Sequence, residues 1–482
     1  MSATHRRNPA ARRNPSDHPR ARSSHLLIAG VAYLAFVIYG SLVPLDFRPM
    51  PLSDAVAAFR QVSFLQLGIG SRADWVANLL LFIPLTFLWS GVLCHGRSAP
   101  VQVIATLFLL AAALALCVGI EFTQLFFPPR TVSQNDMFAE TLGGVLGILA
   151  WWAMGARWMR WYQSWYRAKA PDELSQRLTW TYAAGVFAYG VLPLDLTLSG
   201  VEIFHKWREG KIALLPFASL PADPMFALYE LATDVALWLP LAFLWRLRPQ
   251  RSGLQAWKMT FGAVFLLEAL QLFVYSRSSD VTDLFTGAAG AALGVWLALK
   301  TGAAGSVGHA ARRANPVEPS RRNGDAFSWW PLIGAIGWMG VLMLLFWYPF
   351  NFVSDGAYLR ERLGFLERVP FVTYYYGTEF RAITEVFHKT LFFAPLGALL
   401  AWFVGRLPWL WRFYAAMAAV VALLVAPMLI EFGQMLLPEK FPDTTDWFLE
   451  SLGGLLGYFA FRRIRAALPK RPAASPTSVA PS

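Results

Sequence analysis

Three copies of one pattern of polar residues and glycines divide the chain into repeated units. In each copy a Glu is followed by Gln at +3, Arg or Lys at +9, Asp at +15 and Gly at +22 and +26. This agreement in register predicts three tandem copies of one structural unit. The polar members are Glu121, Gln124, Arg130 and Asp136 in the first copy, Glu268, Gln271, Arg277 and Asp283 in the second, and Glu431, Gln434, Lys440 and Asp446 in the third.

Long apolar runs around these copies predict an all-α polytopic membrane protein. Of the 482 residues 56% are hydrophobic and only 15% are charged, and the mean hydropathy is +0.42. A helix needs about 20 apolar residues to cross the hydrocarbon core of a bilayer. Four spans in each unit would make the three units parallel rather than inverted. We expect twelve spans, at residues 26–44, 75–93, 101–121, 137–154, 179–198, 225–245, 257–275, 283–299, 329–349, 385–404, 409–431 and 446–461.

The positive charges predict the orientation in the membrane. The net charge is +12, and the basic residues concentrate before the first span, between the units and after the last span. These segments fall on one side of the predicted topology, which the positive-inside rule makes cytoplasmic, together with both termini. The excess of Lys and Arg is therefore explained by topology, and we predict no nucleic-acid partner.

Basic and polar segments also mark the unit boundaries. The N-terminal tail and the C-terminal tail, rich in Pro, Ala and Ser, are expected to be disordered. We divide the chain into a basic tail (1–25), repeat 1 (26–155), a cytoplasmic connector (156–178), repeat 2 (179–300), a cytoplasmic linker (301–328), repeat 3 (329–465) and a tail (466–482).

The sequence motifs of common cofactor and metal sites are missing from the chain. The two cysteines, Cys94 and Cys117, suggest neither a disulfide framework nor a thiolate zinc site. No Walker-type loop, GxSxG, HExxH or dinucleotide fingerprint occurs. We therefore predict no metal and no cofactor, and we favour a non-enzymatic role over catalysis.

The repeated residues can serve folding or ligand binding. In each copy a Ser or Asp precedes the repeat Asp by three residues, a spacing that places this Asp in the first turn of the fourth helix, where it complements the helix dipole. The two glycines of each copy fall on nearly the same helix face and would let a neighbouring backbone approach closely. The Glu, Gln and loop cation are expected near one another at the outer ends of the helices. There they can form an outward-facing polar ligand site instead.

One further polar position recurs near the start of the second span of each unit. Asn78, Asp234 and Lys389 occupy it. In one interpretation Asp234 pairs with Lys389 across an interface between units, and Asn78 completes a polar centre. In the other, each side chain points into its own unit or outward to the membrane surface.

The landmarks of these units resemble those of VanZ-like proteins, small integral membrane proteins named for a member linked to teicoplanin resistance. They are NLLLFIPL at 78–85, KIALLPF at 211–217 and E-x-x-Q…R…D…GG-x-x-G at 121–147. The resemblance covers nearly all of the membrane region, once per unit, and implies a multi-pass protein of the bacterial cytoplasmic membrane with a role in the cell envelope. It supplies no biochemical mechanism. The chain departs from the family in having three units and in having Lys440 where the other copies have Arg.

Three functions fit this sequence. The favoured one is binding of a membrane lipid, a lipid-linked envelope precursor or an amphipathic antibiotic at the outer leaflet, which would suit a role in antibiotic resistance. A lipid or small-molecule transporter or flippase is the second, since tandem repeats and a proline within each second span are common in transporters. The third is a membrane-embedded enzyme acting on a lipid-linked sugar or phosphate. The ligand, the active unit and the oligomeric state stay open.

Overall fold

Two compact units, residues 1–160 and 161–482, make up the chain. The first holds repeat 1 and the second holds repeats 2 and 3. The computed structural model describes residues 20–64, 71–167, 171–197, 199–248, 251–300, 329–364, 368–375, 379–438 and 440–467. The predicted disorder of the N-terminal tail up to residue 19 and of the C-terminal tail from residue 468, and the predicted linker 301–328, lie outside the described residues.

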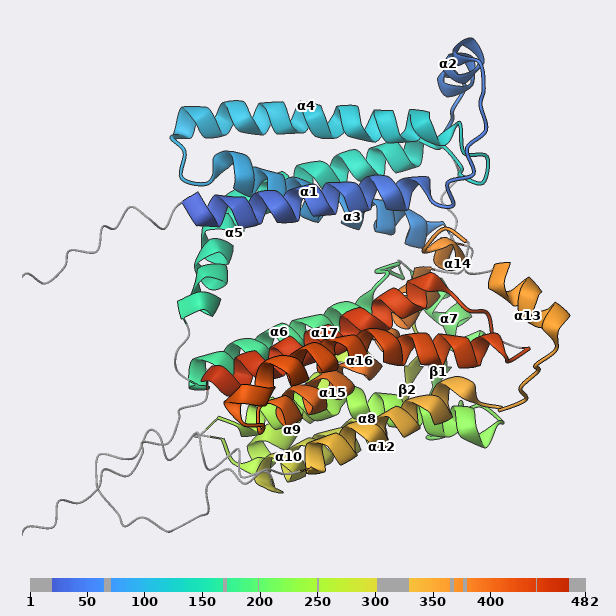
Figure 1. The fold of residues 1–482 in the computed structure, drawn as a ribbon. Coiled ribbons are helices and arrows are strands. Elements are labelled where there is room, and N and C mark those ends of the chain that lie inside the picture. The colour runs from blue at the N-terminus through green and yellow to red at the C-terminus, as the bar shows by residue number, and fades with distance from the viewer. Residues whose placement is uncertain are drawn as a thin grey trace, which may run out of the picture. The chain divides into compact units, whose positions relative to one another are not determined.

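Repeat 1 is built from four long helices that run side by side (Figure 1). Val37, Phe82 and Ile120, each from a different helix, meet in its buried core. Residues 20–25, expected in the tail, are instead the first turns of a helix, and the last helix continues into the predicted connector. The helices are α1 (Arg20–Leu42), the short α2 (Leu52–Arg60), α3 (Arg72–Cys94), α4 (Ala99–Gln124) and α5 (Gln134–Arg167).

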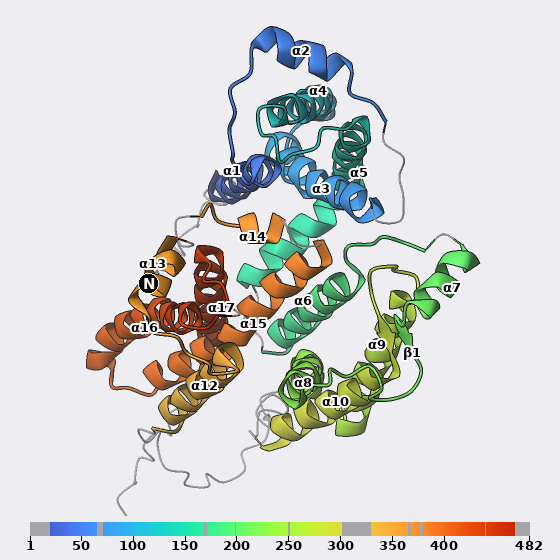
Figure 2. The ribbon, with the colours of Figure 1, turned by 90° about the vertical axis from the view of Figure 1, so that its right-hand side faces the viewer.

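Repeats 2 and 3 have four long helices in the same order as repeat 1, with a short helix after the first of them. In repeat 2 a two-residue parallel pairing joins Ile212 with Ser279 and Ala213 with Asp280. Repeat 2 comprises α6 (Pro171–Val191), α7 (Gly200–Arg208), β1 (Ile212–Ala213), α8 (Pro224–Arg246), α9 (Gly253–Gln271), β2 (Ser279–Asp280) and α10 (Val281–Lys300). Repeat 3 comprises α12 (Trp330–Trp347), α13 (Gly356–Leu363), α14 (Val372–Tyr375), α15 (Glu379–Val404), α16 (Trp409–Met435) and α17 (Thr444–Ala467). Helix α6 lies against α15 and α17, so these two repeats pack directly on each other (Figures 1 and 2).

Within the described ranges, nine helices are long and apolar enough to cross a membrane: α1, α3, α4, α5, α8, α10, α12, α15 and α16. The chain is therefore an all-helical, multi-pass membrane protein. Helices α6, α9 and α17 also lie at predicted spans, but they are more polar, since α9 contains Lys258 and Glu268 and α17 contains Asp446 and Glu450. The twelve-span topology and its orientation stay predictions.

The first long helix of each repeat ends in the same way. It stops before the predicted end of the span because a proline follows, and proline cannot continue the helical hydrogen bonds. The bonds preceding Pro44, Pro193 and Pro349 are cis, and the next residues have left-handed φ angles of 63°, 65° and 64°. Shortly afterwards a backbone N–H binds the carbonyl just beyond the third long helix. These pairs are Arg48 to Phe126, Thr197 to Phe273 and Val353 to Leu436.

The repeated glycines lie where the second and fourth long helices of each unit touch. A Cβ on any of them would overlap a backbone carbonyl oxygen of the facing helix. The predicted close approach of the two helices is confirmed. The facing pairs are Gly143 with Leu79, Gly147 with Ile83, Gly290 with Val235, Gly294 with Leu239, Gly453 with Thr390 and Gly457 with Ala394.

In repeats 2 and 3 a buried cation from a short helix binds the chain at or just after the end of the third long helix. Lys206 of α7 is fully buried, and its ammonium donates to the carbonyls of Gln271 and Val274. Arg362 of α13 donates in the same way to the carbonyls of Pro438 and Lys440. Each cation thereby binds backbone carbonyls at or just beyond the end of the third long helix.

Burial lowers the pKa of Lys206 from its ordinary 10.5 to about 8. The unfolded chain then binds more protons than the folded chain between pH 8 and 10.5, so stability is expected to rise with pH across this window. Thermal unfolding at a series of pH values in this range measures how steeply stability rises with pH. Lys206→Met should flatten it, whereas Arg208→Met, at an exposed position of the same helix, should leave it unchanged. Equal slopes in both variants would contradict the assignment to Lys206.

Candidate functional site

The repeat Glu anchors the start of the fourth long helix. In each unit its carboxylate accepts a hydrogen bond from the backbone N–H of the residue that precedes this helix. The donors and acceptors are Ser133 N to Glu121 Oε2 at 3.3 Å, Asp280 N to Glu268 Oε2 at 3.3 Å and Asp443 N to Glu431 Oε2 at 3.1 Å. In every repeat this carboxylate therefore has a structural role.

The repeat Gln connects the third long helix to the first. Gln124 Nε2 donates to the carbonyl of Ser41 at 2.9 Å, and Gln271 Nε2 donates to that of Gly190 at 3.1 Å. Gln434 is also buried, at 6% exposure, but it faces a cavity described below.

The repeat Asp lies in the first turn of the fourth helix, as predicted. The residue three positions earlier caps that helix. Ser133 Oγ accepts from the N–H of Asp136 at 3.1 Å. Asp280 and Asp443 accept from the N–H groups of Thr282 and Thr445, at 2.7 and 2.8 Å. These caps satisfy N–H groups that the helix itself leaves open.

The loop cations have different surroundings in repeats 2 and 3. Arg277 turns away from Asp283 and donates to the carbonyls of Tyr189 and Leu192 at the end of α6. In repeat 3 Asp446 forms an ion pair with Lys389 of α15. The loop residue Lys440 lines the cavity, and Arg130 keeps its place in the loop of repeat 1.

The residue that meets the repeat Asp comes from the second long helix of the same unit. Asn78 Nδ2 donates to Asp136 Oδ1 at 2.8 Å, and Lys389 forms an ion pair with Asp446. Asp234 faces Asp283. Lys389 is thus engaged inside its own repeat, and the interpretation in which each residue points into its own unit replaces the pairing of Asp234 with Lys389. The fold explains this, because the close contact at the glycines brings these two helices together in every unit.

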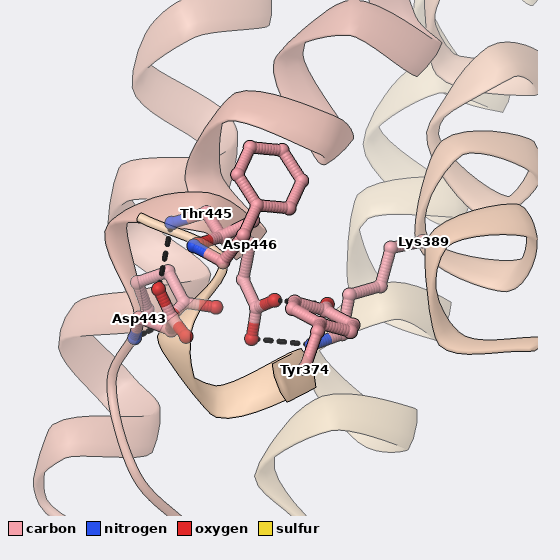
Figure 3. Close-up of polar contacts among 7 residues, drawn as sticks. Tyr374, Lys389, Asp443, Thr445 and Asp446 are labelled. Carbon is pink, nitrogen blue, oxygen red and sulfur yellow. Dashed lines mark hydrogen bonds and ion pairs between the residues drawn. The ribbon is translucent and has the colours of Figure 1, made fainter. Parts of the chain in front are cut away.

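Repeat 3 adds a tyrosine to the ion pair (Figure 3). Tyr374 of α14 donates its phenolic proton to Asp446 Oδ1 at 2.7 Å and accepts from Lys389 Nζ at 3.3 Å. Burial and the adjacent Asp446 carboxylate raise the pKa of Tyr374 far above its usual value, so the phenol keeps the proton that it donates. The three side chains form one network on three different helices.

This network forms the polar wall of a cavity of about 390 Å³. Further polar groups come from α15, from the end of α16 and from the loop before α17, and the wall that α8 and the end of α12 contribute is mainly apolar and aromatic. The polar lining is Tyr374, Glu385, Lys389, Gln434, Lys440, Asp443 and Asp446; the other wall includes Met225, Phe226, Tyr229, Leu345, Phe346 and Tyr348.

Repeat 2 supplies part of that second wall, so the cavity lies between two repeats. Tyr348, which directly follows α12, donates to the side chain of Asp223 at 2.8 Å, and its ring lies 5.7 Å from that of Phe226. The hydrogen bond from Tyr348 lowers the pKa of Asp223, which also caps α8. Three residues further along α8, the ring of Tyr229 lies 5.7 Å from that of Phe392 of α15. Aromatic contacts therefore fix α8 as one wall.

The three repeats correspond to one known family. The VanZ/LLP1 family matches residues 20–155, 179–302 and 332–465. The chain belongs to the VanZ/LLP1 family. No curated protein and no solved structure matches it. The three VanZ/LLP1 matches agree with the three tandem units expected from the sequence, and they support a multi-pass membrane location.

Sequence reasoning missed Tyr374 and Tyr348 of this VanZ/LLP1 protein. Tyr374 lies three residues after Phe371, whose N–H binds Thr445, and the corresponding contact in repeat 2 joins Phe217 to Thr282. Three residues after Phe217 the chain has a leucine. Because the repeats do not share the tyrosine, comparison of the copies gave no signal for it.

Proposed function

We propose that this VanZ/LLP1 protein binds a membrane-embedded amphipathic molecule, a lipid or a lipid-linked envelope precursor, in the cavity of repeat 3. The observation that carries the proposal is the division of the cavity into two walls. One wall presents ammonium, carboxylate and phenol groups to a polar head group. The other presents aromatic and aliphatic side chains to the hydrophobic part, as sites for such ligands commonly do.

The charges of the cavity favour a head group that carries both signs. Lys389 and Lys440 can bind a phosphate or carboxylate, while Glu385 and Asp443 can bind an amine. A zwitterionic head group can use both sets, whereas a purely anionic one would meet the carboxylates. In the orientation expected from the positive-inside rule, the cavity faces the outer leaflet.

The position of the cavity favours binding over transport. Its lining comes from helix ends: the last turn of α12, the first half of α15, the end of α16 and the first turn of α17. Transporter sites commonly lie at the middle of the membrane between broken helices. A site at one boundary suits capture of a head group from the adjacent leaflet.

Lys389→Asn tests this function without removing the fold. The variant recreates in repeat 3 the Asn–Asp pair of repeat 1, so it should stay folded while the cavity loses a positive charge. Mass spectrometry of lipids that copurify with the full chain should show one lipid class enriched over the bulk membrane in the wild type. We expect that enrichment to fall about tenfold or more in the variant, since one charged hydrogen bond contributes roughly 1.5–3 kcal/mol.

Lys258→Asn is the matched control, because it removes an exposed lysine of α9 outside the cavity. It should keep the wild-type lipid profile. Absence of any enriched lipid in the wild type would remove the main support for the function. An enriched lipid that is retained by Lys389→Asn would place the binding site elsewhere.

A further inference from the structure

Glu450 of α17 is a buried acid that the proposed site does not use. It lies one helical turn beyond Asp446, and its exposed fraction is 0%. Among the described residues neither of its carboxylate oxygens has a hydrogen-bond partner. An ionised carboxylate in such a place would lose its hydration without replacement, so the structure needs another way to neutralise it.

The charged groups that face Glu450 come from each helix packed against it. They are Glu431 of α16, Lys389 of α15 and Asp446 on its own helix. Lys389 is already bound to Asp446, and Glu431 uses Oε2 to accept from the N–H of Asp443. Within the described part of repeat 3, Oε1 of Glu431 has no partner. One ammonium therefore serves three carboxyl groups, and the two glutamates are left without a cation.

The helix packing that the repeats share does not require an acid at the position of Glu450, four residues after the repeat Asp. Repeat 2 has Gly287 there, and the space beside it is filled by Val264 and Trp238. The helices of repeat 2 nevertheless meet at the same glycines as those of repeat 3. Repeat 1 keeps a buried acid, Glu140, at 2% exposure. Glu450 is thus an addition to the common fold and not part of its framework.

We propose that Glu450 and Glu431 form a proton-binding site in the core of repeat 3, one turn deeper than the ion pair of Lys389 with Asp446. A proton on Glu450 removes its charge and supplies an O–H donor for the open Oε1 of Glu431. One proton thereby satisfies atoms on both glutamates. The ligand of this site is a proton, and the existence of the site does not rest on the proposed function.

The site can couple ligand binding in the cavity of repeat 3 to proton binding by Glu431 and Glu450. Lys389 contributes to the electrostatic environment of both glutamates. If a ligand in the cavity drew Lys389 away from Asp446, the cluster would lose its one positive charge and would hold its protons more tightly. This linkage alone rests on the proposed function; the proton site stands without it.

Infrared spectroscopy of the purified full chain in lipid nanodiscs tests the proposal. A protonated carboxylic acid has a C=O stretching band that an ionised carboxylate lacks. The wild type should show such a band at neutral pH, and Glu450→Gln should lower its intensity; the buried Glu140 of repeat 1 can contribute the remainder. Glu361→Gln removes an exposed carboxylate of α13 and should leave the band intact.

A second variant keeps the test decisive if Glu450→Gln fails to fold. Glu431→Gln changes the hydrogen-bond acceptor of the proposed O–H and should shift the same band. Spectra of both variants that coincide with the wild type in the C=O region would overturn the proposal. A band that appears only after removal of sodium would also overturn it, because the site would then hold a metal cation at neutral pH.

Discussion

Gly457→Leu is expected to leave little folded protein. A Cβ at this position overlaps the carbonyl oxygen of Ala394, which belongs to the backbone of α15 and cannot rotate away. The two helices must separate, and the contact at Gly453 is then lost as well. Overpacking of a core by a methylene group costs about 1–3 kcal/mol, and separation of a helix pair should exceed that range.

Size-exclusion chromatography and thermal unfolding of the purified variant would measure this loss. Gly337→Leu is the matched control in the same repeat, because a Cβ at Gly337 of α12 has no heavy atom within 4 Å. The control should elute and unfold like the wild type. A Gly457→Leu protein as stable as the control would show that α15 and α17 are not held at this distance.

The repeat pattern predicted the framework of the fold because its residues act on the backbone. Glycines at +22 and +26, the residues that cap the fourth helix and the Asp in its first turn depend only on local helix geometry and on the neighbouring helix of the same unit. Comparison of three copies could therefore find them. The correct placement of Asp136, Asp283 and Asp446 follows from this.

The partners of the charged side chains could not be obtained in the same way. Arg277 lies in the loop between α9 and α10, but it binds carbonyls at the end of α6, which is distant in sequence. One of the two interpretations paired Lys389 with Asp234 because their charges are opposite, whereas the packing of the helices brings Lys389 to Asp446. Charge complementarity restricts possible partners and does not choose among them, whereas the packing of the helices does.

The cavity was beyond prediction because it depends on contacts between repeats. Tyr348 meets Asp223 across the boundary of repeats 2 and 3, and Tyr374 comes from a short helix without a counterpart in repeat 2. The polar groups that set the cavity of repeat 3 apart therefore include residues that the other copies lack. Comparison of copies emphasises what they share, so it favoured the structural residues.

Lys389→Met is expected to destabilise the protein strongly while Lys389→Asn is tolerated. Methionine leaves the carboxylate of Asp446, at 6% exposure, without its cation. Removal of one partner of a buried ion pair typically costs about 3–5 kcal/mol. Asparagine is different, because it can donate a hydrogen bond to the carboxylate as Asn78 does to Asp136.

Thermal unfolding of the wild type and the variants would compare these costs. Lys440→Met removes another lysine that lines the same cavity but lies outside the ion pair, so its midpoint should stay near that of the wild type. The double variant Lys389→Met, Asp446→Asn should recover part of the loss, because it removes the uncompensated charge. If Lys389→Met unfolded no more readily than Lys440→Met, the ion pair would not be a stabilising element of repeat 3. The network of Tyr374, Lys389 and Asp446 would then serve ligand binding and not stability.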